Sequence, residues 1–387
     1  MDRILTTHVG SLIRPPDLVA FLRARENGDP YDEAEYERCL RRSVAEVARQ
    51  QAEVGIDVIS DGEFGKSVSW SRYVRERIGG FEERAVDPDL IGQSVLPGTD
   101  KRMFPDFYAG YEKTQGLTGA LSNWVCTGPI SYVGHVQLER DIADLKAAMD
   151  GLNLTDGFLP VVAPGSAFPV RTDEHYATEQ DYVFAIAGAL NTEYRMIVES
   201  GLMVQVDDAY LTTMYDTMVP PGTLADYREW AELRIEALIR ALDGVPPERA
   251  RYHVCWGSWN APHVGDVGLD EIVDLILRVP VGGYAIEQAN PRHEHEWRVW
   301  ETVRLPEGRQ LLPGLVSHAT NVVEHPELIA QRIERLAALV GRENVVASTD
   351  CGFAQGPFVQ RVHPTIMWAK LRSLADGARL ASTRLWS

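Results

Sequence analysis

Cysteine is scarce in this sequence, with four residues in 387: Cys39, Cys126, Cys255 and Cys351. So few cysteines in so long a chain do not suggest a disulfide framework, and a metal-binding or catalytic role is the better expectation for a cysteine in polar surroundings. Long hydrophobic runs are also missing, since no apolar stretch approaches the roughly 18–20 residues that span a bilayer. The first residues, Met1–Leu5, indicate the approach to a strand and not a secretory signal. We therefore expect a cytoplasmic protein that does not enter a membrane.

Basic residues are outnumbered: 38 Lys and Arg stand against 56 Asp and Glu, which gives a formal net charge of −18 and a pI of about 5.0. Proteins that bind nucleic acid usually carry a basic surface, so this balance argues against such a partner. Apolar residues make up 45% and charged residues 24% of the chain, as in an ordinary globular protein. We expect small-molecule partners, and a homo-oligomer stays open.

Short apolar runs alternate with amphipathic helical stretches along the whole chain. Three helical stretches, at residues 36–54, 224–242 and 326–340, carry apolar residues at helical spacing, and the last has Pro326 at its start and Gly341 just past its end. Strands that alternate with helices favour βαβ units and a parallel sheet. The candidate strands are Leu5–Val9, Ile56–Ser60, Trp124–Thr127, Phe158–Val162, Met203–Val206, Tyr252–Cys255, Tyr284–Ile286, Leu311–Val316 and Val345–Ser348.

The economical arrangement of these strands is a (β/α)8 TIM barrel with one accessory strand or hairpin, in a single domain over residues 1–387. Residues 81–118 are rich in Gly, Pro and aromatics and have no hydrophobic period, so we expect an insertion there that covers one end of the barrel. The runner-up is an open doubly wound sheet in two domains. The sequence lacks both a flexible linker and a phosphate-cradling glycine motif after a strand, and we therefore favour the barrel.

Residues that bind metals stand at the ends of three candidate strands. His253 and Cys255 are two positions apart on one strand and point to the same face, Glu287 ends a second strand, and Cys351 follows a third. The carboxyl ends of parallel barrel strands meet at one face, where these side chains would converge. Two thiolates, an imidazole and a carboxylate suit tetrahedral Zn²⁺, and soft sulfur disfavours Mg²⁺ and Ca²⁺. The spacing alone also fits packing cysteines and a rim ion pair.

The charge of such a site indicates its chemistry. Two thiolates and one carboxylate bring more negative charge than Zn²⁺ neutralises, so the ion would be a poor Lewis acid for a carbonyl. It would still ionise a coordinated thiol and leave the sulfur nucleophilic. This balance favours transfer of an alkyl group to sulfur over hydrolysis.

Several motifs together resemble the catalytic C-terminal barrel of the cobalamin-independent methionine synthase family. With its single barrel, the chain looks closer to stand-alone single-barrel relatives of that family, which include epoxyalkane:coenzyme M transferases. The motifs are Thr6-Thr7-His8-Val9-Gly10-Ser11, Gly62-Glu63-Phe64, Gln205-Val206-Asp207-Asp208, His253-x-Cys255, Glu287 and Asp350-Cys351-Gly352.

The resemblance implies a role for each matching residue. It implies that zinc is bound by His253, Cys255, Glu287 and Cys351. It further implies that homocysteine is bound by Ser11, Glu63 and Asp207, and that His318 is a catalytic histidine that moves a proton. From the residues alone, Glu63 and Asp207 are acids at strand ends suited to an ammonium group, or ordinary salt-bridge partners.

The sequence departs from the family in ways that concern the alkyl donor. The chain has room for one barrel, whereas the full-length synthases have a second. An acid that the family pattern places near Thr213 is missing, and so is a tryptophan near Val170 that would stack on the pterin of folate. We therefore expect a donor other than folate.

Two further histidines follow the Glu287 strand, His293 and His295 within Ala289–Trp297. Residues two apart do not share a helical face, so we do not expect a second metal site. We expect a substrate-facing loop in which Arg292 or a histidine contacts an anionic group.

Our leading hypothesis is zinc-dependent methyl transfer to a small thiol such as homocysteine, with an alkyl donor as second substrate. The same-fold alternative is opening of an epoxide by coenzyme M, whose sulfonate would prefer Arg or Lys, for example Arg14, Lys66, Arg72 or Arg292. A third alternative is a non-catalytic zinc- or thiol-binding protein, which would leave no exchangeable position on the metal.

Overall fold

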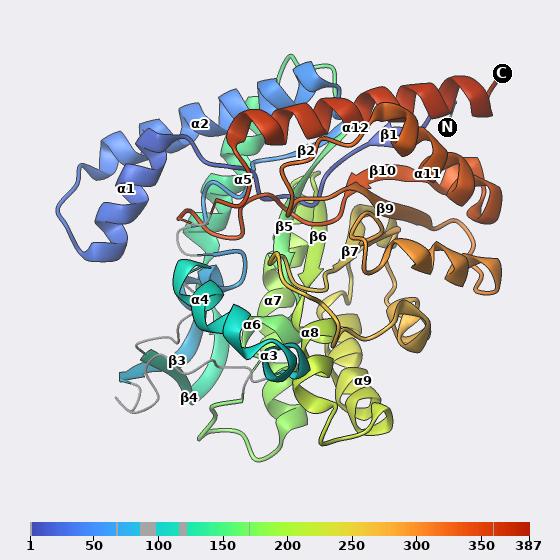
Figure 1. Ribbon diagram of the computed structural model, residues 1–387. Coiled ribbons are helices and arrows are strands. Elements are labelled where there is room, and N and C mark those ends of the chain that lie inside the picture. The colour runs from blue at the N-terminus through green and yellow to red at the C-terminus, as the bar shows by residue number, and fades with distance from the viewer. Residues whose placement is uncertain (1, 67–68, 86–97, 116–121, 170, 359) are drawn as a thin grey trace.

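The computed structural model describes residues 2–387 except 67–68, 86–97, 116–121, 170 and 359 (Figure 1). Eight of the described strands form one parallel sheet in the order β1-β10-β9-β8-β7-β6-β5-β2. The N–H of Asp57 donates to the carbonyl of Thr6 (3.0 Å), so the first and last strands approach each other and the barrel is nearly closed. The predicted (β/α)8 barrel is confirmed. Its strands are β1 Leu5–Thr6, β2 Val58–Ser60, β5 Asp156–Val162, β6 Met203–Asp208, β7 Ala250–Val254, β8 Gly283–Ile286, β9 Gln310–Val316 and β10 Val346–Thr349.

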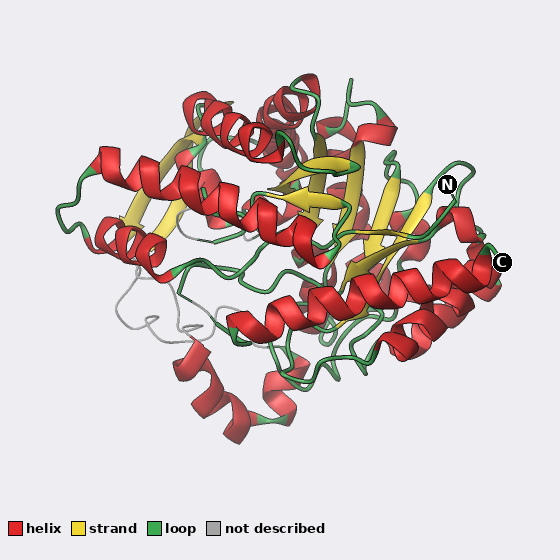
Figure 2. Cartoon of the chain, turned by 90° about the horizontal axis from the view of Figure 1, so that it is seen from above, coloured by secondary structure: helices red, strands yellow, loops and turns green. Residues whose placement is uncertain are grey.

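Helices surround the strands on the outside of the barrel (Figure 2). The longer ones are α1 Pro16–Asn27, α2 Glu33–Val54, α5 His135–Met149, α7 Glu179–Glu199, α9 Leu224–Ala241, α11 Pro326–Val340 and α12 Pro364–Leu385. Shorter ones are α6 Pro164–Ala167, α8 Tyr210–Met218, α10 Val273–Ile276 and the 3₁₀ helices η1 Arg72–Glu76, η3 Pro247–Arg249, η4 Leu269–Glu271, η5 Glu294–Glu301 and η6 Arg342–Asn344. Within the described part of the chain, no helix is both long enough and apolar enough to cross a membrane.

The helix ends follow from local capping. α11 has the predicted bounds, with Pro326 in its first turn and Gly341 at its end. α2 begins at Glu33, earlier than the predicted 36, because the carboxylate of Asp32 accepts a hydrogen bond from the N–H of Glu35 (3.0 Å). α9 begins where predicted, with Thr223 as its N-cap.

The ninth candidate strand, Trp124–Thr127, lies outside the barrel. It belongs to β4 (Ser122–Tyr132), which pairs antiparallel with β3 (Ile78–Ala85) in a separate hairpin. The expected insertion at 81–118 contains the end of β3, α3 (Thr99–Met103) and α4 (Pro105–Gln115), while residues 86–97 and 116–118 are outside the described part. α3 has five residues, and most of the described side chains of α4 are exposed, which fits the missing hydrophobic period. The bounds of the insertion stay a prediction.

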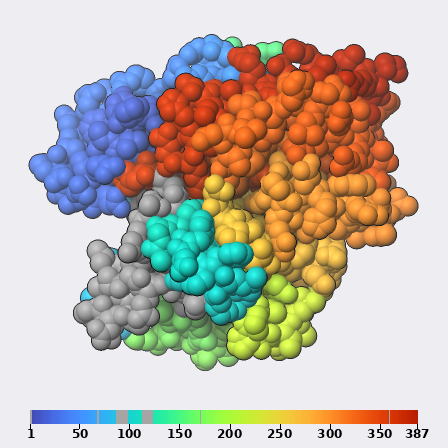
Figure 3. All heavy atoms as spheres, in the orientation of Figure 1, coloured from blue at the N-terminus to red at the C-terminus, as the bar shows by residue number. Residues whose placement is uncertain are grey.

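The helix α3 contacts the loop after β7. Both carboxylate oxygens of Asp100 accept hydrogen bonds from backbone N–H groups of His263 (2.7 Å), Val264 (2.8 Å) and Gly265 (2.9 Å). In the space-filling view the cyan residues of α3 and α4 lie against the yellow residues of this loop (Figure 3). This region therefore covers part of the carboxyl end of the barrel.

Layers of polar side chains inside the barrel support the site above them. Arg251 on β7 is buried and donates to the side chains of Gln205 (2.8 Å) and Thr7 (2.9 Å). Gln205 in turn donates through Nε2 to Asp207 (2.7 Å). Because strand side chains alternate, His253 and Asp207 point into the barrel one layer above Arg251 and Gln205, toward the carboxyl end of the strands.

Candidate active site

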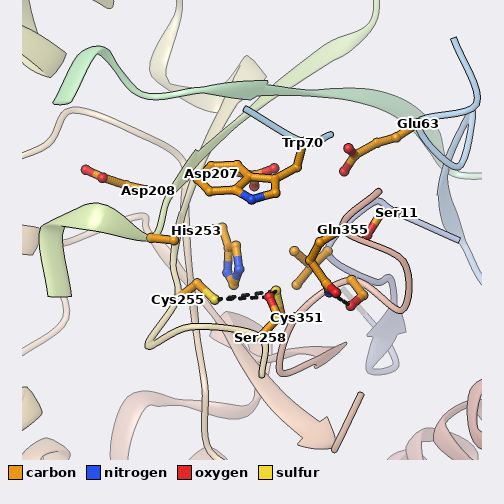
Figure 4. Close-up of a pocket in the computed structure, with 13 residues that line it drawn as sticks. Ser11, Glu63, Trp70, Asp207, Asp208, His253, Cys255, Ser258, Cys351 and Gln355 are labelled. Atoms are coloured by element: carbon orange, nitrogen blue, oxygen red, sulfur yellow. Dashed lines mark hydrogen bonds between the residues drawn. The ribbon is translucent and has the colours of Figure 1, made fainter. Parts of the chain in front are cut away.

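Side chains from several strand ends meet in one cavity (Figure 4). The candidate residues that line it are Ser11, Glu63, Asp207, His253, Cys255 and Cys351. Others in its wall are Val9, Trp70, Asp208, Ala209, Ser258, Gly352 and Gln355. The convergence expected from the strand ends is thus present for six of the eight candidate residues.

Two sulfurs and an imidazole form the core of the site. The Sγ atoms of Cys255 and Cys351 lie 3.4 Å apart, and a ligand atom of His253 lies within 4.8 Å of both. All three side chains are buried. The Oγ of Ser258 lies 3.1 Å from the Sγ of Cys351, and the N–H of Gly257 points at Cys255 (3.3 Å). This is a compact set of soft donors.

The orientation of His253 suits a metal ligand. Its Nδ1 lies 3.4 Å from the carbonyl of Ala285, while its Nε2 is buried without a hydrogen-bond partner among the described residues. A backbone carbonyl at one ring nitrogen is a common device for fixing the other nitrogen toward a metal. An orphaned nitrogen beside two thiols fits a thiophilic ion such as zinc.

The charges of the three groups are mutually dependent. The Cys255 thiol donates to the Cys351 sulfur and holds the pKa of Cys351 well below its usual value. Burial alone would lower the pKa of His253, but the neighbouring Cys351 raises it to about 9. The metal-free site therefore favours a thiolate–imidazolium pair, the form in which a cation can replace the proton.

Glu287 is fully buried at the end of β8, next to this group but not within it. Its Oε1 accepts the backbone N–H of Trp256 (3.1 Å), and Asn290 Nδ2 lies 3.5 Å from its Oε2. Burial, together with the charge of Cys351, raises the pKa of its carboxyl. Asp350 ties the strand ends together, because its Oδ1 accepts the N–H of Gln288 (2.9 Å). The role of Glu287 as a fourth ligand stays a prediction.

The three candidate head-group residues are buried in the same cavity. Glu63 has a left-handed backbone (φ 61°) and forms an ion pair with Lys66 (3.1 Å), so one of the suggested cations stands beside the acid. Asp207 has a pKa raised to about 7 by burial and by the charge of Glu63. A Cβ at Gly352 would lie 1.9 Å from the Oγ of Ser11, so only glycine leaves room for that hydroxyl.

His318 lies just beyond the end of β9 and is not in the cavity wall. Both ring nitrogens are buried and lack hydrogen-bond partners among the described residues, and burial lowers the pKa to about 4, so the ring is neutral near pH 7. Glu324 holds the loop by accepting the N–H of Ser317 (2.8 Å) and pairing with Lys370 (2.8 Å). The catalytic role of His318 stays a prediction.

Two positions depart from the family pattern, Thr213, where an acid is missing, and Val170, where a tryptophan is missing. Thr213 lies in α8, where its hydroxyl donates to the carbonyl of Ala209 (3.0 Å). Val170 lies outside the described residues.

The loop expected after β8 leads into the 3₁₀ helix η5, with His293 buried just before this helix and His295 exposed within it. His293 contacts carboxylates of the protein itself and not an open substrate position, while Arg292 donates to the carbonyl of Val264 (3.2 Å).

Sequence reasoning missed three residues of the cavity wall, Trp70, Ser258 and Gln355. None lies in a strand. The only available signal was that Ser258 is three positions after Cys255, in the loop of the metal strand.

Comparisons with known proteins find related sequences and structures. A sequence model of the cobalamin-independent synthase catalytic domain matches residues 166–367, which is more than half of the chain. A 2-hydroxypropyl-CoM lyase of Xanthobacter autotrophicus is 25% identical over 89% of this chain and 86% of its own. A methionine synthase of Sulfolobus acidocaldarius is 24% identical over 90% of this chain and 85% of its own.

Among solved structures, a B12-independent methionine synthase from Shewanella sp. W3-18-1 superposes with a TM-score of 0.70 at 18% identity, over 99% of both chains. At this identity the likeness speaks for the fold. The match of the family model, with its motifs gathered at one end of the barrel, decides the family. The chain belongs to the cobalamin-independent synthase catalytic-domain family.

Proposed function

We propose that this protein is a zinc-dependent transferase that alkylates a small thiol. Homocysteine is the first candidate acceptor, and a methyl group is the first candidate for the transferred alkyl group. The observation that carries the proposal is the single cavity that holds His253, Cys255 and Cys351 together with the buried acids Glu63 and Asp207. Family membership and the methionine synthases among the relatives support it. A cytoplasmic location and a homo-oligomer stay predictions.

The metal is proposed from the donor set. His253, Cys255 and Cys351 would hold zinc, with Glu287 as the expected fourth ligand. Zinc bound there would lower the pKa of a thiol that joins it, so that the thiol binds as a nucleophilic thiolate.

The remaining residues would orient the acceptor. The carboxylates of Glu63 and Asp207 suit an ammonium group, and the Ser11 hydroxyl can donate to a carboxylate. Lys66 offsets the charge of Glu63 at 3.1 Å, so the pocket is less acidic than two free carboxylates would make it. This combination favours a zwitterionic amino-acid thiol.

In the proposed reaction a carbon–sulfur bond forms as the bond from the alkyl carbon to its donor breaks. The thiol loses its proton, and the leaving group of the donor gains one. His318 is neutral, so one ring nitrogen carries a proton and the other can accept one, and the ring would pass a proton on through that unprotonated nitrogen. Trp70 in the cavity wall would help to exclude water from the thiolate.

X-ray absorption at the zinc edge tests the proposal during titration with homocysteine and then with coenzyme M. We expect homocysteine to add one sulfur ligand to the zinc. Unchanged coordination with every thiol would contradict the proposal and favour a non-catalytic zinc protein, although the relatives named by the comparisons are enzymes.

A second candidate function is addition of coenzyme M to an epoxide. It is favoured by the similarity to 2-hydroxypropyl-CoM lyase over 89% of the chain and by the cation Lys66 beside the cavity residue Glu63. In the same titration, a sulfur ligand added by coenzyme M and not by homocysteine would establish it.

A further inference from the structure

A second group of polar side chains, buried except for the half-buried Asp266, lies outside the cavity wall, in the segments that follow β7 and β8. It consists of His263, Asp266, His293 and Glu296, and we name it the histidine–carboxylate cluster. Asp266 joins the two rings, since its Oδ2 lies 2.9 Å from His263 Nδ1 and 2.8 Å from His293 Nε2. Glu296 completes the cluster at 3.0 Å from His293 Nδ1. None of these residues has a role in the reaction proposed above.

The hydrogen-bond partners define the protonation of both rings. The remaining nitrogen of His263, Nε2, lies 2.9 Å from the carbonyl of Trp259. Each of the four ring nitrogens thus faces an oxygen that only accepts, so each ring carries two protons and a positive charge. Burial alone would lower the two pKa values, but Asp266 raises them, to about 9 for His263 and about 10 for His293.

The cluster contacts the metal strand through Trp256. The His293 ring centroid lies 4.8 Å from that of the Trp256 indole, at an angle of 39°. The indole Nε1 donates to the carbonyl of Val267 (2.7 Å), one residue after Asp266. Trp256 directly follows Cys255, and its backbone N–H donates to Glu287 (3.1 Å). A displacement of the Trp256 backbone would therefore move both Cys255 and the hydrogen bond that fixes Glu287.

The loop that carries the cluster is held from its other side as well. The Asp100 carboxylate accepts the N–H groups of residues 263–265, the turn in which His263 has a left-handed backbone (φ 56°). The loop after β7 is thus fixed between α3 and the cluster.

We propose that the histidine–carboxylate cluster is a positioning device for the metal site: Asp266 clamps His263 and His293 so that Trp256 holds Cys255 and Glu287 in their binding geometry. This inference rests on the metal site proposed above. Residues behind the ligands of a metal commonly change its affinity by 10- to 100-fold when they are removed.

The test compares His293→Leu with His295→Leu in the full chain. His295 lies two residues further on, in the first turn of η5, and is exposed, so it controls for the change of residue type. We expect His293→Leu to weaken zinc about 10- to 100-fold in competition with a chromophoric chelator, and His295→Leu to match the wild type. Cobalt(II) replaces zinc in a second readout, where the sulfur-to-cobalt absorption band reports the geometry of the two thiolates and should shift only in His293→Leu.

Asp266→Asn provides a second variant of nearly unchanged size, should His293→Leu fold poorly. We expect the same weaker zinc binding and shifted cobalt band. Thermal midpoints of the metal-free variants separate positioning from stability. Lower midpoints with wild-type zinc affinity and an unshifted band would overturn the inference. A wild-type protein that binds no zinc would instead overturn the proposed function.

Discussion

The sulfur atoms of Cys255 and Cys351 lie 3.4 Å apart, although 96 positions separate the residues in the sequence. The barrel creates this contact, because β7 and β10 deliver both residues to the same carboxyl-end face. Two thiols this close together can bind the same metal ion.

One zinc per chain should copurify, and Cys255→Ser or Cys351→Ser should remove most of it, because each change replaces a soft sulfur donor with a poorer ligand. The measurement is metal content by mass spectrometry of the purified protein. Cys126→Ser is the control, since Cys126 lies in the β3–β4 hairpin, outside the metal group. Full zinc in both ligand variants would refute the site.

Glu63→Gln and Asp207→Asn should each weaken homocysteine binding about 10- to 100-fold, the effect of losing a charge-assisted hydrogen bond of roughly 1.5–3 kcal/mol. Zinc content should not change. Calorimetric titration gives the affinities, and coenzyme M, which has no ammonium group, is the matched ligand control. Equal affinities in wild type and both variants would exclude an amino-acid thiol.

His318→Asn should lower the turnover number while leaving zinc and thiol binding intact. Proton transfer by a positioned side chain contributes about 10²- to 10⁴-fold to rate, which sets the expected loss. Asparagine keeps a polar group of similar size in the loop that Glu324 holds. Steady-state kinetics with the best donor gives the comparison, and an unchanged turnover number would remove His318 from the mechanism.

The free energy of unfolding of the metal-free protein should fall between about pH 4 and pH 7 in part because of Asp61. Burial and the charge of Asp141 raise the pKa of this carboxyl to about 7 in the folded chain. A raised pKa contributes stability below the unfolded pKa, and that stability is lost as the pH rises to the folded value. The slope from one such group is at most about 1.4 kcal/mol per pH unit.

Asp61→Asn should therefore make the free energy of unfolding fall less between pH 5 and pH 7. The fall in the variant should be roughly 1–3 kcal/mol smaller than in the wild type. Urea unfolding at the two pH values measures the difference. An amide can still accept the hydrogen bond that Asp61 receives from the N–H of Glu63 (2.9 Å). Parallel pH profiles would show that Asp61 does not titrate in this range.

Methyltetrahydrofolate should be a poor methyl donor. Its amine must be protonated as the carbon–nitrogen bond breaks, which requires an oriented pterin and a proton relay. The sequence lacks the tryptophan near Val170 that would orient the pterin and the acid near Thr213 that would complete the proton relay. Methylcobalamin, a methylated sulfonium or an epoxide should react more readily. Mass spectrometry of thioether products ranks the donors, and efficient turnover with folate alone would reverse this expectation.

The sequence by itself determined the strands of the barrel, some of its helices and the inward faces of the strands. Periodicity and end residues gave α11 at its observed bounds, and the two-residue spacing of His253 and Cys255 put both on one face, since each signal lies within a few neighbouring residues. It could not tell whether Trp124–Thr127 joins the barrel or a hairpin, because a short apolar run does not specify its partner strand.

Only the tertiary structure decided which distant groups meet. Trp70 and Gln355 reach the cavity from loops whose paths no local pattern records, and Asp266 meets His293 across 27 positions. The altered acidity of Asp207 is also a tertiary property, because burial and the approach of Glu63 arise only when the strands close around them. Periodicity is written in neighbouring residues, whereas contact, burial and charge coupling depend on segments that the chain brings together only when it folds.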